Sequence, residues 1–210
     1  MFGSNDFSGS STMRKSFVLA VGAALAALVS TSAVRAEDVI RFYDPATGSF
    51  QTIKKTPGKR VMESPVKREV IDYTGPYGKG TIVVNTEERR LYYVLGDGKA
   101  IKYGIGVGRP GFTWAGTHRI TRKAEWPGWT PPPAMRKRQP NLPYHMPGGP
   151  DNPLGARAMY LGSSIYRIHG TAEPWTIGQA VSSGCIRMTN EDVTHLYEQV
   201  GVGTKVVVIR

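Results

Sequence analysis

The sequence predicts a mainly β domain that carries one convincing helix near its C-terminus. Short runs rich in β-branched and aromatic residues, such as TIVVN (81–85) and KVVVI (205–209), have the composition of strands. Two of these runs are joined by a glycine-rich turn, which is typical of a β-hairpin. Only the segment near 190–201 has the apolar spacing of a helix. Together these observations place a single β-rich domain over residues 79–210.

The strands are expected to follow one another from residue 81. The turn Gly96-Asp97-Gly98 contains residues that readily adopt positive φ, so the runs on either side of it should pair as a hairpin. THRITRKA (117–124) alternates between apolar and polar residues, as a half-exposed strand should. The expected strands are TIVVN (81–85), RLYYVL (90–95), KAIKYGIGV (99–107), THRITRKA (117–124), AMYLG (158–162), IYRIHG (165–170) and KVVVI (205–209).

A proline-rich stretch separates two of these strands, from Trp126 to Gly155. Its prolines exclude a central strand or a helix interior, because proline lacks the backbone N–H and fixes φ. We therefore expect a long ordered loop. Loops of this length in compact domains are usually functional, so this one is a candidate wall of a substrate groove.

The single helix is expected to begin at Asn190, which can cap it, and to end near Gly201. Glu191 and Asp192 suit the first turn, where negative charge is favoured. One apolar face is formed at helical spacing by Val193, Leu196, Tyr197 and Val200.

The N-terminal part of the chain predicts export to the periplasm. A basic pair, Arg14 and Lys15, precedes the apolar run at 17–29, and Val34 and Ala36 occupy the small-residue positions of a cleavage site. The run of 13 apolar residues is shorter than the roughly 20 needed to span a bilayer. We therefore expect a cleaved signal peptide over 1–36, with no stable membrane anchor afterwards, and Met13 is a possible alternative start.

Residues 37–78 are rich in proline, glycine and charge, and predict a flexible basic arm before the domain. Removing residues 1–36 leaves 24 of the 27 basic residues and 15 of the 16 acidic ones, a formal charge of +9. Outside the cytoplasm this charge indicates attraction to anionic envelope polymers rather than to nucleic acid. A solvated basic surface that only aids solubility is the alternative.

The candidate nucleophile is Cys185, the one cysteine of the chain. A lone cysteine cannot form an internal disulfide, so in an oxidising compartment its thiol is a liability unless it is used. One interpretation is a buried cysteine that behaves as a small hydrophobic residue. The polar, glycine-containing surroundings favour a catalytic thiol, with His169, 16 positions upstream (185 minus 169), as its base.

The residues around Cys185 suit acyl-transfer chemistry. Successive N–H groups at Ser183, Gly184 and Cys185 could form an oxyanion hole. Arg187 could orient the site or bind a substrate carboxylate through its planar guanidinium group. His169 ends one expected strand and Cys185 precedes the expected helix, so both lie at element ends, where a rigid scaffold can hold functional groups together.

The sequence HGT, followed by PWTIG and then SSGCIRMTNED, resembles the signature of the L,D-transpeptidase catalytic domain family of the YkuD type. MPGGPDNPLGARAMYLG resembles the corresponding segment of its ErfK-like branch, and the resemblance covers about Lys79 to Arg210. It implies a β-sandwich-like domain that acts on peptidoglycan stem peptides through a cysteine acyl-enzyme. It also implies Cys185 as nucleophile, His169 as base and proton donor, Gly170 as the carbonyl that orients this base, and Arg187 as the family's arginine.

The chain departs from the family at Ser183, where the commonest motif has histidine. This puts in doubt any role of a second imidazole, although a backbone N–H at this position could still serve an oxyanion. Three function classes stay open: transfer to an amine, which forms 3-3 crosslinks or anchors an envelope protein to the wall; hydrolysis of the same bond by an L,D-carboxypeptidase; and non-catalytic wall binding.

Other candidate residues weigh less. The remaining histidines, His118, His145 and His195, lack metal-ligand spacing, so we expect no metal and no cofactor. Trp126, Trp129 and Trp175 could stack on a substrate, but packing of loops onto the sheet is the simpler interpretation. The glycines of GIGVG (104–108) precede no expected helix, so turns or bulges explain them better than a nucleotide site.

Overall fold

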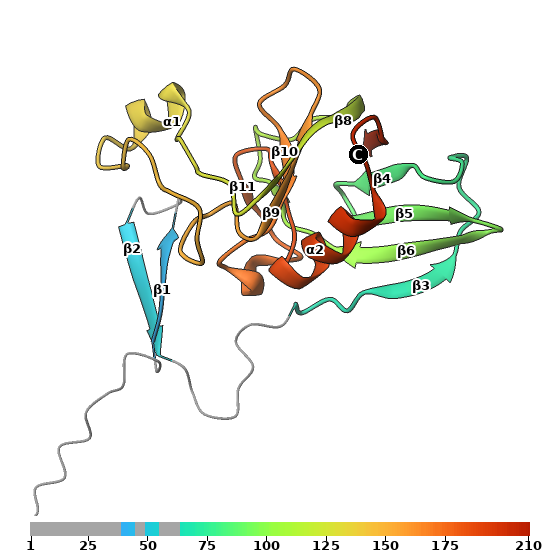
Figure 1. The fold of residues 1–210 in the computed structure, drawn as a ribbon, viewed down its shortest axis with the longest axis horizontal. Coiled ribbons are helices and arrows are strands. Elements are labelled where there is room, and N and C mark those ends of the chain that lie inside the picture. The colour runs from blue at the N-terminus through green and yellow to red at the C-terminus, as the bar shows by residue number, and fades with distance from the viewer. Residues whose placement is uncertain (1–38, 45–48, 55–63) are drawn as a thin grey trace, which may run out of the picture. The chain divides into compact units, whose positions relative to one another are not determined.

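The computed structural model describes the backbone at residues 39–44 and 49–54 and the complete residues 64–210 (Figure 1). A mixed sheet of nine strands dominates, with parallel pairs at β10–β12 and β13–β4 and antiparallel pairs elsewhere. Its order is β12 (Ile186–Arg187), β10 (Arg167–His169), β9 (Arg157–Leu161), β8 (Gly116–Glu125), β13 (Lys205–Ile209), β4 (Ile82–Asn85), β5 (Arg90–Gly96), β6 (Lys99–Gly104) and β3 (Glu69–Asp72).

Two smaller sheets and three helical segments complete the described elements. The small sheets are β11 (Ala180–Ser182) with β7 (Val107–Gly108), and β1 (Val39–Asp44) with β2 (Ser49–Lys54). The helical segments are α1 (Pro133–Arg138), the 3₁₀ turn η2 (Pro174–Thr176) and α2 (Asn190–Gln199). The predicted fold class, a mainly β domain with one longer helix near the C-terminus, is confirmed.

The predicted hairpin is present between β5 and β6, which pair antiparallel. Asp97 and Gly98 adopt φ values of 50° and 68°, the left-handed conformations that the turn requires. The C-terminal run also forms a strand, β13. It lies between β8 and β4 rather than at an edge, and Val206 and Val208 on it are buried.

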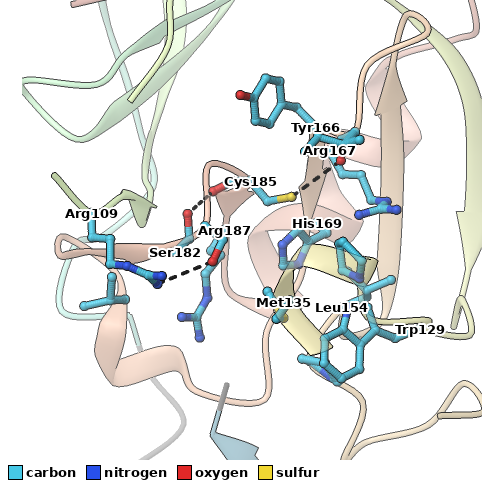
Figure 2. A pocket seen from close by; sticks show the side chains of 15 residues that line it. Arg109, Trp129, Met135, Leu154, Tyr166, Arg167, His169, Ser182, Cys185 and Arg187 are labelled. Carbon is cyan, nitrogen blue, oxygen red and sulfur yellow. Dashed lines mark hydrogen bonds between the residues drawn. The ribbon is translucent and has the colours of Figure 1, made fainter. Parts of the chain in front are cut away.

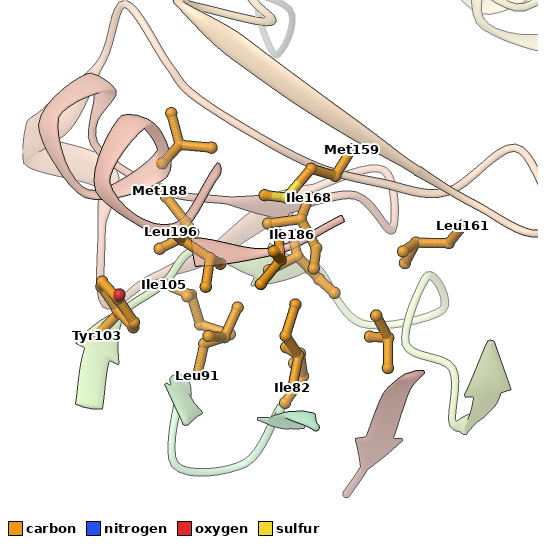
Figure 3. Packing of buried hydrophobic residues seen from close by; sticks show 14 of the residues in the cluster. Ile82, Leu91, Tyr103, Ile105, Met159, Leu161, Ile168, Ile186, Met188 and Leu196 are labelled. Atoms are coloured by element: carbon orange, nitrogen blue, oxygen red, sulfur yellow. The ribbon is translucent and has the colours of Figure 1, made fainter. Parts of the chain in front are cut away.

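The nine-stranded sheet curls until its two ends approach each other. One hydrophobic cluster joins residues from β5 and β6 to residues from β10 and β12, although these strands lie far apart in the sheet order. Figure 3 shows Leu91 and Tyr103 on one side of this core, and Ile168 and Ile186 on the other. The approach is completed by an antiparallel bridge between Gly106 and Arg187, whose backbone N–H groups donate to each other's carbonyls at 2.8 and 2.9 Å.

Helix α2 covers this core, as its predicted apolar face requires. Val193 and Leu196 are fully buried, and Val200 is buried just beyond the helix end. The predicted cap was wrong by one residue: Thr189 is the N-cap, and its hydroxyl accepts from the Asp192 N–H at 3.1 Å. The side chain of Asn190 instead accepts from the Ala156 N–H at 2.8 Å, which ties the helix start to the proline-rich stretch.

The C-terminus of the helix also differs from the prediction. The helix ends at Gln199, and Val200 follows it with extended backbone angles (φ −123°, ψ 151°). Gly201 is not among the glycines with positive φ, so no left-handed glycine cap forms there.

The proline-rich stretch between β8 and β9 is ordered, as expected, but it contains the short helix α1, which the sequence analysis missed. Pro132 precedes this helix and Pro133 begins it, a position where the missing N–H costs nothing because the first turn leaves it unpaired anyway. The stretch has its own small hydrophobic cluster, with Met135 packed against it: Trp129, Leu142, Met146 and Leu154.

The segment expected to be a flexible arm, 37–78, contributes regular structure in its described parts. Strands β1 and β2 pair with each other, and β3 extends the large sheet at the edge beside β6, so this sheet begins before Lys79. Strand β3 was missed because an edge strand buries little: Val70 on it is 64% exposed. The predicted signal peptide lies outside the described residues. Within the part of the chain that was searched, no helix has the length and apolar character needed to cross a membrane.

Candidate active site

Cys185 and His169 line the same pocket, as Figure 2 shows. The topology brings them together: His169 is the last residue of β10, and Cys185 immediately precedes β12, its parallel neighbour. In this register His169 pairs with Arg187, so Cys185 lies two positions before the partner of His169 along the adjacent strand. The Cys185 thiol points toward the loop before β10, with its Sγ 4.0 Å from the carbonyl oxygen of Ile165.

The imidazole of His169 is buried and held in one tautomer. Its Nδ1 lies 2.6 Å from the Gly170 carbonyl oxygen, which can only accept, so Nδ1 carries the proton. Nε2 is then unprotonated and able to accept a proton. Burial first, and then the positive charge of Arg187, lower the pKa of His169 to about 3, against the opposing effects of the Gly170 and Leu154 backbone. The imidazole is therefore neutral at neutral pH.

The thiol of Cys185 is also neutral in the resting site. Burial raises the pKa of this thiol, and the nearby charges of Arg167 and Arg187 oppose the increase without cancelling it. The sequence analysis expected cationic neighbours to favour a thiolate. The structure adds desolvation, which favours the uncharged thiol. The arrangement is thus a neutral thiol beside a neutral imidazole, suited to proton transfer as the sulfur attacks.

The loop before Cys185 is fixed by the hydroxyl of Ser182. This hydroxyl donates to the Cys185 carbonyl at 2.6 Å and accepts from the Gly184 N–H at 3.1 Å. Gly184 has a φ of 106°, and a Cβ added there would lie 2.6 Å from Cε1 of Tyr166, so both conformation and space require glycine. Because Ser182 already binds the Gly184 N–H, this group is not available for the predicted oxyanion hole in the resting state.

Of the two roles predicted for Arg187, orientation of the site and binding of a substrate carboxylate, its contacts fit the first better. It is buried, forms an ion pair with the buried Glu173 and donates to the hydroxyl of Thr171 at 2.7 Å. These contacts neutralise its charge and tie β12 to the segment that follows β10. Arg187 therefore organises the site, and its carboxylate partner comes from the protein itself.

Two aromatic residues that the sequence analysis did not single out support the nucleophile loop. The Nε1–H of Trp114 donates to the Gly184 carbonyl at 2.7 Å. The indole of Trp114 stacks on the ring of Tyr166, with centroids 4.3 Å apart and planes 7° from parallel. No local pattern marks Trp114, because its contact with the loop joins residues 70 positions apart in the sequence.

Ser183, the residue that departs from the family motif, has a cationic partner. Its hydroxyl accepts from an Nη1–H of Arg109 at 3.3 Å. Arg109 comes from the segment after β7, and its backbone N–H donates to the Ser182 carbonyl at 3.0 Å. Arg109 is a second residue of the pocket that sequence reasoning missed.

The proline-rich stretch forms one wall of the pocket, through Trp129, Pro132, Met135, Pro153 and Leu154. This wall is apolar, and Figure 2 shows Trp129, Met135 and Leu154 of it on the side of the pocket where His169 lies. The location fits the prediction of a groove wall; its role in admitting an acceptor stays a prediction.

The other histidines lie away from this pocket. His145 lies 2.9 Å from the Thr130 hydroxyl, and His195 lies 2.8 Å from that of Tyr103. His118 contacts Trp114 edge-on. Within residues 64–210, no three histidine, cysteine or acidic side chains group as they would around a metal ion.

Comparison with known proteins agrees with this site. The sequence model of the YkuD family, described as the L,D-transpeptidase catalytic domain, matches residues 79–208, which include both Cys185 and His169. The Probable L,D-transpeptidase ErfK/SrfK of Escherichia coli (strain K12) is 44% identical over 137 residues, which cover 61% of this chain and 43% of the relative. The chain therefore spans less than half the length of that relative.

The match extends over a larger share of two further proteins. The Putative L,D-transpeptidase in the ATP synthase subunits region (ORF 5) of Fuscovulum blasticum is 39% identical over 66% of this chain and 74% of the relative. A crystal structure from Brucella melitensis, described as a Probable carnitine operon oxidoreductase caia, is 44% identical over 70% of this chain and 96% of that one, with a TM-score of 0.48. Its description differs from the other two, and the family model, which spans most of the chain, decides between them. The chain belongs to the L,D-transpeptidase catalytic domain family.

Proposed function

We propose that this protein is a peptidoglycan L,D-transpeptidase that works through a thioester on Cys185. One observation carries the proposal: a neutral thiol and an imidazole with an unprotonated Nε2 line one pocket at the ends of adjacent strands. The donor would be a tetrapeptide stem in which a diamino acid is linked to a terminal D-Ala. Family membership supports the class of reaction, and the identities of donor and acceptor are part of the proposal.

In the first half-reaction, Nε2 of His169 takes the proton of the Cys185 thiol while Sγ attacks the carbonyl carbon of the diamino acid. The tetrahedral intermediate collapses by breaking the amide C–N bond. His169 returns the proton to the departing amine, D-Ala leaves, and a thioester remains on Cys185.

In the second half-reaction, an acceptor amine attacks the thioester and gives its proton to His169. The C–S bond breaks, and the sulfur regains the proton from the imidazole. The acceptor could be the side-chain amine of another stem, which gives a 3-3 crosslink, or an amine of an envelope protein, which gives a covalent wall anchor. Water as acceptor would make the enzyme an L,D-carboxypeptidase. The apolar wall from the proline-rich stretch favours an amine, because it limits the water near the thioester.

The oxyanion would be bound by backbone N–H groups of the nucleophile loop. Ser182 occupies the N–H of Gly184, whereas within the described residues no acceptor is found for the N–H groups of Ser183 and Cys185. In a trans peptide the carbonyl and the following N–H point in opposite directions. The hydrogen bond from Trp114 keeps the Gly184 carbonyl pointing toward Trp114. The Cys185 N–H then points away from Trp114 and toward the reacting carbonyl of the substrate.

The substitution Trp114→Phe tests this orientation. It keeps an aromatic ring against Tyr166 and removes only the N–H donor to Gly184. We expect acylation of Cys185 by a peptide donor to slow about 10-fold, less than the roughly 100-fold or more that follows removal of a direct oxyanion donor. Alkylation of the same thiol by iodoacetamide creates no oxyanion, so its rate should stay within about twofold of the wild-type rate.

His118→Gln is the matched control, since His118 also contacts Trp114 but lies away from the nucleophile loop. It should leave both rates unchanged. If Trp114→Phe slowed alkylation and acylation equally, Trp114 would support only the packing of the loop.

The reaction itself is tested on purified sacculi incubated with the protein lacking residues 1–36. We expect new 3-3 crosslinked dimers or protein-linked muropeptides in the digest, measured by chromatography with mass spectrometry. If only tripeptides appeared with an amine acceptor in excess, the enzyme would be an L,D-carboxypeptidase and not a transpeptidase.

The proposed location is the periplasm, which the N-terminal sequence pattern supports. Stem peptides belong to that compartment, and the excess of basic residues would attract the enzyme to anionic envelope material.

A further inference from the structure

The pocket around Cys185 carries more positive charge than the protein itself balances. Arg109, Arg167 and Arg187 line it, and no aspartate or glutamate does. Within residues 64–210, where side chains are described, only Arg187 of these three has a carboxylate within ion-pair distance. Two guanidinium groups therefore lie at the pocket without a carboxylate from residues 64–210, which is the environment of a bound anion.

The two guanidinium groups have different surroundings. Arg167 lies over the ring of Tyr160, 5.1 Å from its centroid, and its charge opposes the effect of burial on the Cys185 thiol. Arg109 lies beside the nucleophile loop, with its Nη1 donating to the Ser183 hydroxyl. In the view of Figure 2, Arg109 lies to the left of Cys185, and His169 lies below the sulfur.

Arg109 is held ready to bind. Its guanidinium packs on the face of Phe112, 4.3 Å from the ring centroid, while Ser183 fixes one of its five N–H groups. The remaining N–H groups keep the planar fork that pairs with a carboxylate through two hydrogen bonds. Since the side chain is already held on two sides, little conformational entropy remains to be lost on binding.

We propose that Arg109 binds a carboxylate of the donor stem peptide and so selects donors that carry it. This inference rests on the proposed function. It assigns to Arg109 the carboxylate-binding role that the sequence offered as one alternative for Arg187, because Arg187 already pairs with Glu173. A tetrapeptide stem offers the terminal carboxylate of D-Ala and, where the diamino acid has a second carboxyl group, the free carboxylate of that residue. Both have the chemistry that the guanidinium recognises.

The test uses the full-length protein, with the Cys185 thiol kept reduced, and three synthetic tetrapeptide donors. One donor has both carboxylates free, one is amidated at the terminal carboxylate, and one is amidated at the carboxylate of the diamino acid. We expect the wild-type protein to lose roughly 10- to 100-fold in kcat/KM with one of the two amides, the loss typical of a hydrogen-bonded charged pair. The amide that causes the loss identifies the carboxylate bound.

In Arg109→Gln, the kcat/KM for the donor with both carboxylates free should fall to the value that the wild-type protein shows with the discriminating amide. The variant should therefore use these two donors equally well. Arg109→Lys should restore part of the preference, because it keeps the charge and loses the fork. Arg138→Gln is the matched control: Arg138 lies over the same Phe112 ring at 5.6 Å but does not line the pocket, so the preference should persist. An unchanged preference in Arg109→Gln, or its loss in Arg167→Gln alone, would overturn the proposal.

Calorimetric binding of the same donors to Cys185→Ala separates this inference from the proposed reaction. Weaker binding of one amide, abolished by adding Arg109→Gln, would support the carboxylate site even if the wild-type protein turned over none of the donors. Equal binding of all three donors would overturn the site even if turnover were normal.

Discussion

Cys185→Ala is expected to abolish acyl-enzyme formation and to leave the fold intact. Sγ of Cys185 is the group that forms the thioester, and no other cysteine in the chain can replace it. The side chain is small and half-buried, and its Sγ lies 4.0 Å from the Ile165 carbonyl oxygen, so its truncation removes little packing. Mass spectrometry after incubation with a tetrapeptide stem or a carbapenem should show an adduct on Cys185 of the wild-type protein and none on the variant.

Cys185→Ser is the closer control for this experiment, because it keeps the size of the side chain and a proton for His169 to accept. A hydroxyl is a far weaker nucleophile than a thiol, so this variant should also form no adduct on the same timescale. Thermal unfolding of both variants should resemble that of the wild type. Absence of an adduct from folded, reduced wild-type protein would contradict catalysis through this residue.

His169→Ala is expected to be far more damaging than Ser183→Ala. Loss of a general base typically costs on the order of 100-fold or more in rate, and the tautomer of His169 leaves Nε2 unprotonated, as this role requires. Ser183→Ala keeps the backbone N–H and removes only the hydroxyl that accepts from Arg109. Its kcat/KM should fall less than about 10-fold with the free donor.

The dependence of the acylation rate on pH is an independent test of the protonation state of His169. Since burial lowers the pKa of His169 to about 3, lowering the pH through the usual histidine range does not protonate the base. Acylation should therefore show no inflection near pH 6.5 and should lose rate only as the pH falls toward 3. An inflection near pH 6.5 that His169→Ala removes would contradict the buried, neutral imidazole. For the preceding comparison, equal losses of rate in His169→Ala and Ser183→Ala would mean that the Ser183 side chain takes part in the chemistry.

The sequence predicts those parts of the fold whose signals are local. The hairpin at Asp97 and Gly98 follows from residues that tolerate positive φ, and the buried face of α2 follows from the spacing of Val193 and Leu196. Strand β3 could not be predicted this way, because an edge strand with exposed side chains lacks an apolar pattern. Helix α1 could not be predicted from the density of prolines, which usually break helices, although the first turn of a helix tolerates them.

The same distinction holds in the candidate site. Cys185 and His169 belong to a recognisable motif, so their residue types and spacing alone predict a nucleophile and its base. The ion pair of Arg187 with Glu173, and the contacts of Arg109 and Trp114 with the nucleophile loop, depend on how distant segments meet. A single sequence carries no local mark of such contacts.

The bridge between Gly106 and Arg187 has a consequence for the folding of the chain. It joins segments 81 positions apart in the sequence (187 minus 106), so the surroundings of Cys185 are complete only once this long-range contact has formed. Contacts between such distant segments are slow to form. Until then Cys185 is an ordinary thiol with an ordinary pKa, open to oxidants and to mixed disulfides. Closure of the sheet therefore ends a period of chemical vulnerability in the newly made chain, at the same step that assembles the catalytic pair.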